Sequence, residues 1–416
     1  MRYDTPLRRQ HSAWSIRQGQ LLTERVEASA LSESRPEQAI HQFEVSYLPY
    51  GPGDEAGEAT CEIVSTYGPV EPEYASLRRE CGLLDAPHRT LIELRGSERL
   101  DFLDRMLTQK IVGLPSGTVT RSFWLNRKGR IVSDLLVANL EDRTLLELDV
   151  HAAEETFASL DAFLFTEDVE MCSLQESHLE LRIHGPLALV ALSELIDGGE
   201  APSSEGACAA TLAGHPVVLF RSDDTGEPGL GLICQREHAE AVWERLLEWS
   251  SSEGTRGIRP VGWSAFNAAR IEGGTPLFNI DFGPDCLPHE TGLLEGRVSF
   301  EKGCYLGQEI VARVQNLGQP RQILRSLALE GEGLPVSGTQ VFAVLDSADG
   351  QPHMGPQVGV VTSSTISPMM GAKPIAFAML KYDYAQAGGR LLLAADGAPE
   401  LASVRDGLRY LPGQPS

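Results

Sequence analysis

The sequence predicts an α+β protein built from two related α+β lobes, followed by a small C-terminal β-barrel. A short duplication indicates the two lobes: Glu-Leu-Arg at 93–95 recurs at 180–182, and His-Ala at 151–152 recurs at 238–239 with the same offset. That offset of roughly 90 residues exceeds the 20–50 residues of a solenoid repeat, so it favours two whole lobes. From about residue 321, short apolar runs such as TQVFAV and VGVVTSS are separated by Gly, Pro and Ser, which is typical of a small barrel.

The order of elements repeats within the duplication. In each copy an apolar strand (LIELRG, then LELRIHG) ends at a glycine and is followed by a helix (SERLDFLDRML, then PLALVALSEL). Each copy later has a second helix that begins at the shared His-Ala pair (HAAEETFASLDAFL, then HAEAVWERLLEW). We therefore expect an N-terminal extension over 1–70, a two-lobed module over 71–320 (about 71–175 and 176–320, with interleaving allowed), and a barrel domain over 321–416.

The N-terminal extension carries no function that its sequence reveals. Its acidic, Gly-rich run GPGDEAGEATCE at 51–62 is typical of a loop or linker.

Composition limits the class of protein. A chain of 416 residues with 42% hydrophobic content predicts two to three globular domains. The net charge of −23 argues against nucleic acid as a direct partner, because that affinity depends on Lys and Arg neutralising phosphates. No stretch approaches the roughly twenty apolar residues of a membrane span, and the first residues have no apolar secretion signal, so we expect a cytoplasmic protein without membrane contact.

The seven cysteines are scattered and form no CxxC pair. This predicts neither a zinc ribbon nor a disulfide framework, and we expect no metal site.

The run KGCYLGQE at 302–309 is the most informative stretch. It places Cys304 after Lys302, whose ammonium could lower the pKa of a nearby thiol, in a turn marked by Gly303 and Gly307. The two glycines would allow a positive φ or a close backbone approach. A cysteine in such a chain can equally be a small buried hydrophobe, so the residues alone leave both roles open.

This run, continued as KGCYLGQEIVAR, closely resembles the K-G-C-[FY]-x-G-Q-E motif of the YgfZ branch of the YgfZ/GcvT folate-binding superfamily. Lys302, Gly303, Gly307, Gln308 and Glu309 support the motif around the cysteine. The similarity extends from about residue 74 to 393, through YASLRRECGLLDAPH and VGVVTSSTISPMMG. It implies a central folate cleft between the two lobes, with tetrahydrofolate or a one-carbon derivative as the cofactor, whereas the first seventy residues match poorly.

Asp134 lies in LNRKGRIVSDLLV, where one carboxylate stands among apolar neighbours after a glycine turn. Such a carboxylate could orient an amine or exchange a proton with it, but a solvent-facing Asp at a strand end is the alternative. The segment resembles the superfamily's G-x-x-x-x-D-L pattern, whose aspartate lies beside the reactive nitrogens of tetrahydrofolate in aminomethyltransferases. The resemblance gives this role to Asp134, with Asn126 and Arg130 as weaker neighbours.

Three further residues are candidates for folate contacts. TGEPG resembles the family's T-G-E-x-G loop, which implies that Glu227 accepts two hydrogen bonds from a pterin edge; an acidic hairpin turn is the alternative. AARIEGG resembles the R-x-E-x-G segment, which implies that Arg270 contacts folate, although an ion pair with Glu272 or Asp281 is equally open. Tyr305 could stack on a folate ring or belong to the core. We expect these residues, Asp134 and the KGCYLGQE turn to border one cleft.

The resemblance implies a tetrahydrofolate-binding YgfZ-type protein in iron–sulfur protein assembly or repair, with indirect effects on tRNA modification. Cys304 would be the reactive thiol and iron–sulfur client proteins the partners, since one cysteine cannot hold a cluster alone. Aminomethyltransferases carry a K-x-D-F-I-G-K-like segment where this chain has KGCYLGQE, which argues against a lipoyl-carrier partner. The alternatives are a tetrahydrofolate-dependent aminomethyltransferase or demethylase that uses Asp134, and a folate-binding protein without turnover. Whether the chain is an enzyme stays open.

Overall fold

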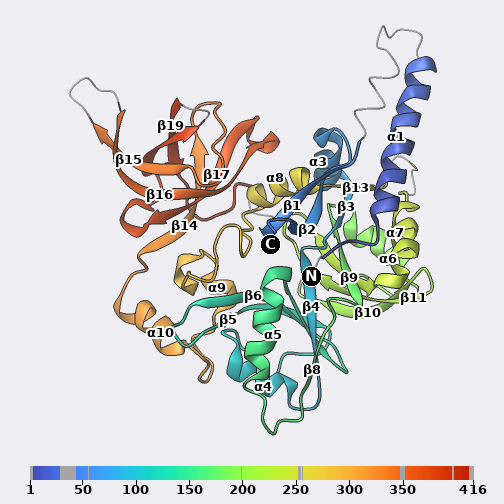
Figure 1. Cartoon of the computed structure of the whole chain (residues 1–416), viewed down its shortest axis with the longest axis horizontal. Helices are drawn as coiled ribbons and strands as arrows, with labels where there is room; N and C mark the ends of the chain where they lie inside the picture. The colour runs from blue at the N-terminus through green and yellow to red at the C-terminus, as the bar shows by residue number, and fades with distance from the viewer. Residues whose placement is uncertain are drawn as a thin grey trace. The chain divides into compact units, whose positions relative to one another are not determined.

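The computed structural model describes residues 3–28, 44–54, 56–197, 199–251, 254, 256–346, 352–395 and 398–411. These residues form two compact units that alternate along the chain (Figure 1). Unit 1 comprises Met1–Leu91, Ser173–Asp223 and Glu227–Phe266, and unit 2 comprises Ile92–Cys172, Asp224–Gly226 and Asn267–Ser416. The fold is the predicted α+β architecture with a closed C-terminal barrel.

Unit 1 contains a six-stranded sheet. Its strand order is β10 (Ala207–Leu212), β11 (His215–Arg221), β12 (Gly229–Gln235), β9 (His178–His184), β3 (Cys81–Asp85) and β13 (Ile258–Pro260). Unit 1 also contains the helices α3 (Val70–Arg79), α6 (Ala188–Leu195) and α7 (Ala239–Leu247), besides α1 (Arg8–Ala28) and the start of α8 (Trp263–Gly273). Alternate β9 residues, Leu179, Leu181 and Ile183, enter the core with Leu192 of α6 and Trp243 of α7, as expected where one face of a strand is apolar.

The described part of the N-terminal extension belongs to unit 1. Helix α1 (Arg8–Ala28) follows a segment whose Leu7 is fully buried, and β1 (Ser46–Gly53) pairs with β2 (Ala59–Thr66). The loop predicted for 51–62 is wrong in part, because this run supplies the end of β1, a turn and the start of β2. Cys61 of this run is buried opposite Tyr50, the buried residue that precedes the run in β1.

Unit 2 contains the other copy of the duplication. Its sheet order is β5 (Thr118–Leu125), β6 (Ile131–Asn139), β7 (Thr144–Asp149), β4 (Arg89–Arg95) and β8 (Glu170–Ser173), with helices α4 (Arg99–Met106) and α5 (Ala153–Asp161). The series β4-α4-β5-β6-β7-α5 repeats as β9-α6-β10-β11-β12-α7, and both copies have the same strand order. The predicted duplication is therefore confirmed.

The repeated Glu-Leu-Arg forms the same ion pair in both copies. Arg95 donates from Nε to Glu93 Oε1 at 2.8 Å on β4, and Arg182 donates from Nε to Glu180 Oε1 at 2.7 Å on β9. Residues two apart on a strand share a face, so the glutamate and the arginine can pair in both copies.

Unit 2 continues through α8 (Trp263–Gly273), which begins in unit 1, then α9 (Leu294–Arg297) and α10 (Gln308–Leu317), to the barrel, drawn in orange and red in Figure 1. The closed barrel has the order β14 (Gln322–Leu329), β17 (Lys373–Lys381), β16 (Pro352–Ser367), β15 (Gln340–Asp346), β18 (Arg390–Ala395) and β19 (Ala398–Val404). The first barrel strand begins at Gln322, while the barrel shares unit 2 with the residues from Asn267 onward, so a separate barrel domain over 321–416 stays a prediction. Closure leaves this sheet without exposed edges.

A buried acid in unit 1 predicts a pH dependence of stability. Asp85 on β3 lies 3.4 Å from His11 of α1, and burial raises the pKa of Asp85 to about 7. In the unfolded chain Asp85 loses its proton near pH 4, whereas in the folded protein it keeps the proton up to about pH 7. The free energy of unfolding therefore does not depend on Asp85 below about pH 4 and falls as the pH rises from about 4 to about 7. Asparagine has no proton to lose, so the unfolding free energy of Asp85→Asn should rise by about 2–3 kcal/mol relative to that of wild type as the pH goes from 5 to 8. Urea unfolding at several pH values measures this difference. A difference that stays constant over this range would contradict the assignment.

Candidate functional site

Asp134 lies in the middle of β6, opposite Phe123 of β5. Its neighbours Leu135 and Val137 point into the hydrophobic core, so the strand alternation places Asp134 on the other face. The side chain is nevertheless buried, with the residue 9% exposed. Asp134 is therefore not solvent-facing in the structure.

Arg297 holds the Asp134 carboxylate by two hydrogen bonds. Nε donates to Oδ1 at 2.7 Å and a terminal nitrogen donates to Oδ2 at 3.1 Å. This is the bidentate geometry that a guanidinium makes with a carboxylate. Arg297 ends α9 and is itself buried, with its guanidinium carbon 5.8 Å from the centre of the Phe123 ring.

Sequence reasoning missed Arg297. Its only local signal is a single basic residue in the segment just before KGCYLGQE, and nothing in the chain pairs it with a strand residue 163 positions away.

Lys302 caps the end of α4. Its ammonium donates to the carbonyl oxygens of Asp104, Leu107 (2.9 Å) and Gln109 (2.9 Å), and lies 3.3 Å from the Asp104 carboxylate. The last carbonyls of a helix lack intrahelical partners, and a cation there also meets the negative end of the helix dipole. Burial lowers the pKa of Lys302, and Asp104 offsets part of this effect. The ammonium is thus engaged by the helix end, and its expected effect on the Cys304 thiol has no support in these contacts.

Cys304 itself is exposed and forms no disulfide. The buried alternative for this cysteine does not hold, so its thiol is accessible in the turn before α10.

Gly307 has both the positive φ and the close backbone approach expected of the motif glycines. It precedes α10 with φ of 81°, and a Cβ there would lie 2.7 Å from the Asn126 carbonyl oxygen and 3.0 Å from the Cα of Gly129. Gly129 also has a positive φ, 69°, and a Cβ on it would lie 2.9 Å from Cβ of Ile310. Gly303 differs, because it has no positive φ and a Cβ there would meet nothing within 4 Å.

Asn126 organises the β5–β6 turn against which Gly307 packs. Its Oδ1 accepts from the backbone N–H of Lys128 at 2.9 Å and of Arg130 at 3.1 Å. The Arg130 guanidinium donates to the carbonyl oxygen of Asp285. Asn126 therefore stabilises the turn itself, and Arg130 connects the turn to Asp285.

The remaining motif residues support the start of α10. Gln308 is its first residue and donates from Nε2 to the Gly303 carbonyl at 3.5 Å, whereas Glu309 is exposed in the first turn. Tyr305 is buried in a cluster with Phe123, Phe278 and others, and burial raises its pKa to about 12. Its ring therefore belongs to the core, the second of the two roles that the sequence left open.

Arg270 is fully buried and uses its guanidinium within unit 2. It donates to Asp281 Oδ2 at 2.7 Å, Ser363 Oγ at 2.7 Å, Asn267 Oδ1 at 2.9 Å and the Thr275 carbonyl at 3.1 Å. The ion pair with Asp281 was one of the open alternatives. With 0% exposure, this side chain offers no surface to a folate carboxylate, so the structure gives Arg270 a role in joining α8 to barrel strand β16.

Glu227 lies in the turn between β11 and β12 of unit 1. One carboxylate oxygen is 3.6 Å from a terminal nitrogen of Arg78 of α3, and about a quarter of the side chain is exposed. Glu227 therefore combines a nearby cation with an accessible carboxylate. Because Glu227 belongs to unit 1 and Asp134 to unit 2, the cleft that they are expected to share stays a prediction.

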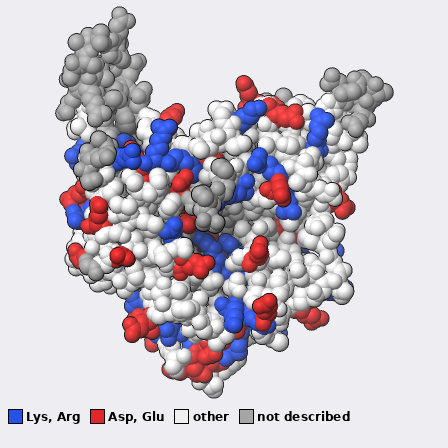
Figure 2. Space-filling model, turned by 180° about the vertical axis from the view of Figure 1, so that it is seen from behind, with Lys and Arg blue, Asp and Glu red and all other residues white. Residues whose placement is uncertain are grey.

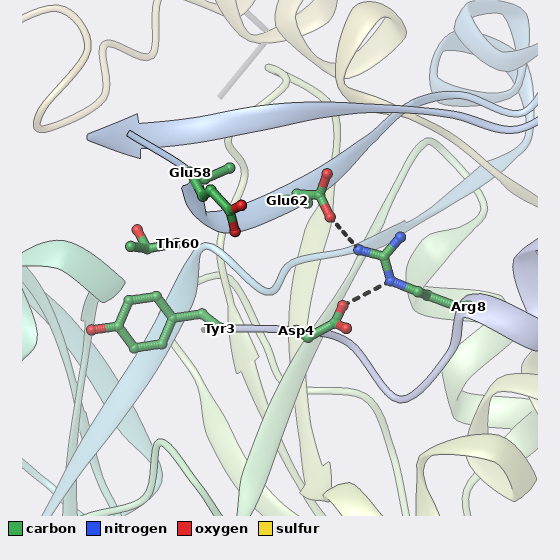
Figure 3. A pocket seen from close by; sticks show the side chains of 7 residues that line it. Tyr3, Asp4, Arg8, Glu58, Thr60 and Glu62 are labelled. Carbon is green, nitrogen blue, oxygen red and sulfur yellow. Dashed lines mark hydrogen bonds and ion pairs between the residues drawn. The ribbon is translucent and has the colours of Figure 1, made fainter. Parts of the chain in front are cut away.

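Unit 1 also has a hollow of about 460 Å³ that none of the predicted site residues lines. Figure 3 shows Arg8 between Asp4 and Glu62, to which it donates at 2.9 and 2.6 Å, with Tyr3, Glu58 and Thr60 around the opening. The pair with Glu62 fastens the N-terminal segment to β2, whereas the pair with Asp4 lies within that segment. On the face shown in Figure 2, basic and acidic side chains are interspersed.

Comparison with known proteins gives the family. Residues 57–302 match the family model described as the GCVT N-terminal domain, and the chain belongs to this family. It is similar to the aminomethyltransferase of Chlorobium chlorochromatii, 29% identical over 346 residues (82% of this chain, 89% of that one), and to that of a Geobacillus species, 27% identical over 328 residues (78% and 86%).

A solved structure has the same fold. The glycine cleavage system aminomethyltransferase T of Bartonella henselae is 23% identical with a TM-score of 0.73, covering 90% of this chain and 98% of that one. The predicted superfamily is thus confirmed, whereas the YgfZ branch stays a prediction. Within the described residues, no helix combines the length and apolar character needed to cross a bilayer.

The close approach at Gly307 predicts a sharp difference between two motif glycines. Gly307→Ala must accept a positive φ and a backbone contact below 3 Å, which should cost about 2–4 kcal/mol of unfolding free energy. Gly303→Ala is the matched control and should stay within about 0.5 kcal/mol of wild type. Denaturant unfolding measures both, and equal losses would show that the Gly307 contact does not constrain the fold.

Proposed function

We propose that this chain binds tetrahydrofolate and acts as a GcvT-type transferase of a one-carbon unit, with Asp134 orienting the reacting amine. The observation that carries the proposal is the buried Asp134 carboxylate, fixed on β6 by the two hydrogen bonds from Arg297. It stands in a chain that resembles proteins named aminomethyltransferase along most of their length. A cytoplasmic location is part of this proposal.

The geometry suits an orienting role for Asp134. Each oxygen accepts one hydrogen bond from Arg297, and a carboxylate oxygen can accept at least one more. The bidentate contact also fixes the plane of the carboxylate, so a further N–H donor would meet it in one orientation. Tetrahydrofolate, when bound, supplies the nitrogen that accepts the one-carbon unit.

Glu227 is proposed to hold the pterin edge. Its carboxylate is partly exposed and can accept from two adjacent N–H groups at once. Arg270 and Tyr305 do not fit a direct folate contact, because the Arg270 guanidinium is fully buried with four protein acceptors and the Tyr305 ring is in the core. The proposed folate contacts are therefore reduced to Asp134 and Glu227.

The donor of the one-carbon unit is proposed only as an amine that carries an aminomethyl or N-methyl group. KGCYLGQE replaces the segment that aminomethyltransferases carry at this position, which speaks against a lipoyl carrier. A panel of aminomethyl-lipoyl carrier, sarcosine and dimethylglycine, each with tetrahydrofolate, would identify the donor by its product. The aminomethyl donor would give methylene-tetrahydrofolate and ammonia, whereas direct transfer of a methyl group from either methylamine would give methyl-tetrahydrofolate and the demethylated amine.

Calorimetry with tetrahydrofolate tests the binding part. Glu227→Ala should weaken binding by about 2–4 kcal/mol through the loss of a charge-assisted, two-point contact. Asp134→Asn keeps the size of the side chain and should lower turnover at least about 100-fold, because the amide cannot accept at both positions. Exposed Glu309→Gln is the control and should bind as wild type does. Absence of heat at millimolar tetrahydrofolate would refute the proposal.

The second candidate function is YgfZ-type maintenance of iron–sulfur proteins through Cys304. The observation that favours it is an exposed thiol in a turn that Lys302 and Gly307 hold in place. Iron–sulfur client proteins would then be the partners, with effects on tRNA modification following indirectly.

Cys304→Ser separates this candidate from the transferase. Serine has nearly the same size but lacks thiol reactivity, so the variant should fold, bind tetrahydrofolate and fail to restore iron–sulfur enzyme activity in a deletion strain. Exposed Cys172→Ser is the matched control and should restore it. Full rescue by Cys304→Ser would leave the transferase as the only candidate of the two.

A further inference from the structure

Residues 297–311, which we call the motif strap, belong to unit 2 and contact its segment 92–172 at three points. At its start, Arg297 binds Asp134 on β6. In its middle, Lys302 binds the carbonyls at the end of α4. Near its end, Gly307 packs on the turn at Gly129, two residues before β6 begins. Two of the three contacts therefore hold the hairpin that carries Asp134.

The backbone of the strap is fixed beside Arg297. Thr108 donates from Oγ1 to the Arg297 carbonyl at 2.7 Å, and the Ser299 N–H donates to the Thr108 carbonyl at 3.0 Å. The same hydroxyl accepts from the N–H of Phe123, the residue opposite Asp134, at 2.9 Å. Through Thr108, a movement of Arg297 would disturb both the strap backbone and β5, the strand beside Asp134.

Only arginine fits this position. Its planar guanidinium bonds both oxygens of Asp134, whereas a lysine ammonium is a single point charge that cannot reproduce the fork. Both partners are buried, and a buried charge that loses its partner is costly, so the pair must stay formed or be replaced by another contact.

We propose that Arg297 is a positioning residue that couples the Asp134 carboxylate to the Cys304 turn. A donor that bonds Asp134 shares the carboxylate oxygens with Arg297 and so weakens the two hydrogen bonds from the guanidinium. This loosens the start of the motif strap, and the turn that carries the exposed Cys304 thiol becomes more mobile. The nature of that donor rests on the proposed function, whereas the coupling itself is present without ligand.

The test measures the labelling rate of Cys304 by a maleimide and the hydrogen exchange of residues 297–311. All variants carry Cys172→Ser, because Cys172 is the other exposed thiol among the described residues. Half-buried Cys208 will react slowly, since burial raises its pKa. Asp134→Asn and Arg297→Lys each break the fork, and exposed Arg313→Lys on α10 is the matched control.

Without ligand, Asp134→Asn and Arg297→Lys should each raise the labelling rate at least threefold and speed exchange in the strap, while Arg313→Lys changes neither. Tetrahydrofolate should raise the wild-type rate and leave that of Arg297→Lys unchanged. A merely structural role would lower the melting temperature without this loss of response to the ligand.

Unchanged rates in both fork variants, with cooperative unfolding retained, would overturn the inference. Calorimetric binding of tetrahydrofolate without any change in wild-type labelling would also overturn it and leave the proposed function standing. Faster labelling in the fork variants without any tetrahydrofolate binding would instead refute the proposed function and support the coupling. If Arg297→Lys does not fold, Asp134→Asn alone decides the ligand-free arm.

Discussion

The close contact between Gly129 and Gly307 is the constraint on which the candidate site depends. Both residues have a positive φ, and a side chain on either would collide with the opposing segment. Because the turn at Gly129 leads directly into β6, this contact sets how the motif segment lies along the strand that carries Asp134. The motif glycine is therefore explained by backbone geometry alone, before any chemistry of Cys304 is considered.

Buried ion pairs fix the rest of unit 2 in a similar way. Arg270 joins α8 to Asp281 and to Ser363 of the barrel, and Arg297 joins α9 to Asp134. Taking such charges out of water is expensive, and an apolar pair of equal volume could be as stable. What the forked guanidinium adds is direction, because only one arrangement of the segments satisfies its hydrogen bonds. We regard specificity of arrangement, rather than stability, as their main contribution.

The sequence predicts the duplicated lobes and the barrel well because these depend on local patterns, whereas Asp134 is selected by resemblance and its role stays a prediction. Strand alternation, the shared order of elements and short apolar runs can be recognised within tens of residues. It fails where partners are distant: Arg297 meets Asp134 across 163 positions, and nothing local distinguishes it from a surface arginine. The hairpin over 51–62 was missed because Gly and acidic residues dominate this run and Cys61 is its one buried position among the described residues, so no alternation marks a strand. Arg270 shows the converse, a family-like residue whose local pattern does not reveal its burial.

The two candidate functions differ in sequence mainly within the motif strap. Within this segment, Lys302 contacts the end of α4 and Gly307 packs on the β5–β6 turn. Replacing the residues between these anchors changes what the turn exposes, here Cys304, without disturbing the sheet beneath it. Asp134 and its strand are then free to keep an orienting role toward an amine. Under the two proposals, a family fold with one altered turn would combine a folate site with thiol chemistry, because the anchors and the exposed residues are separate parts of one short segment.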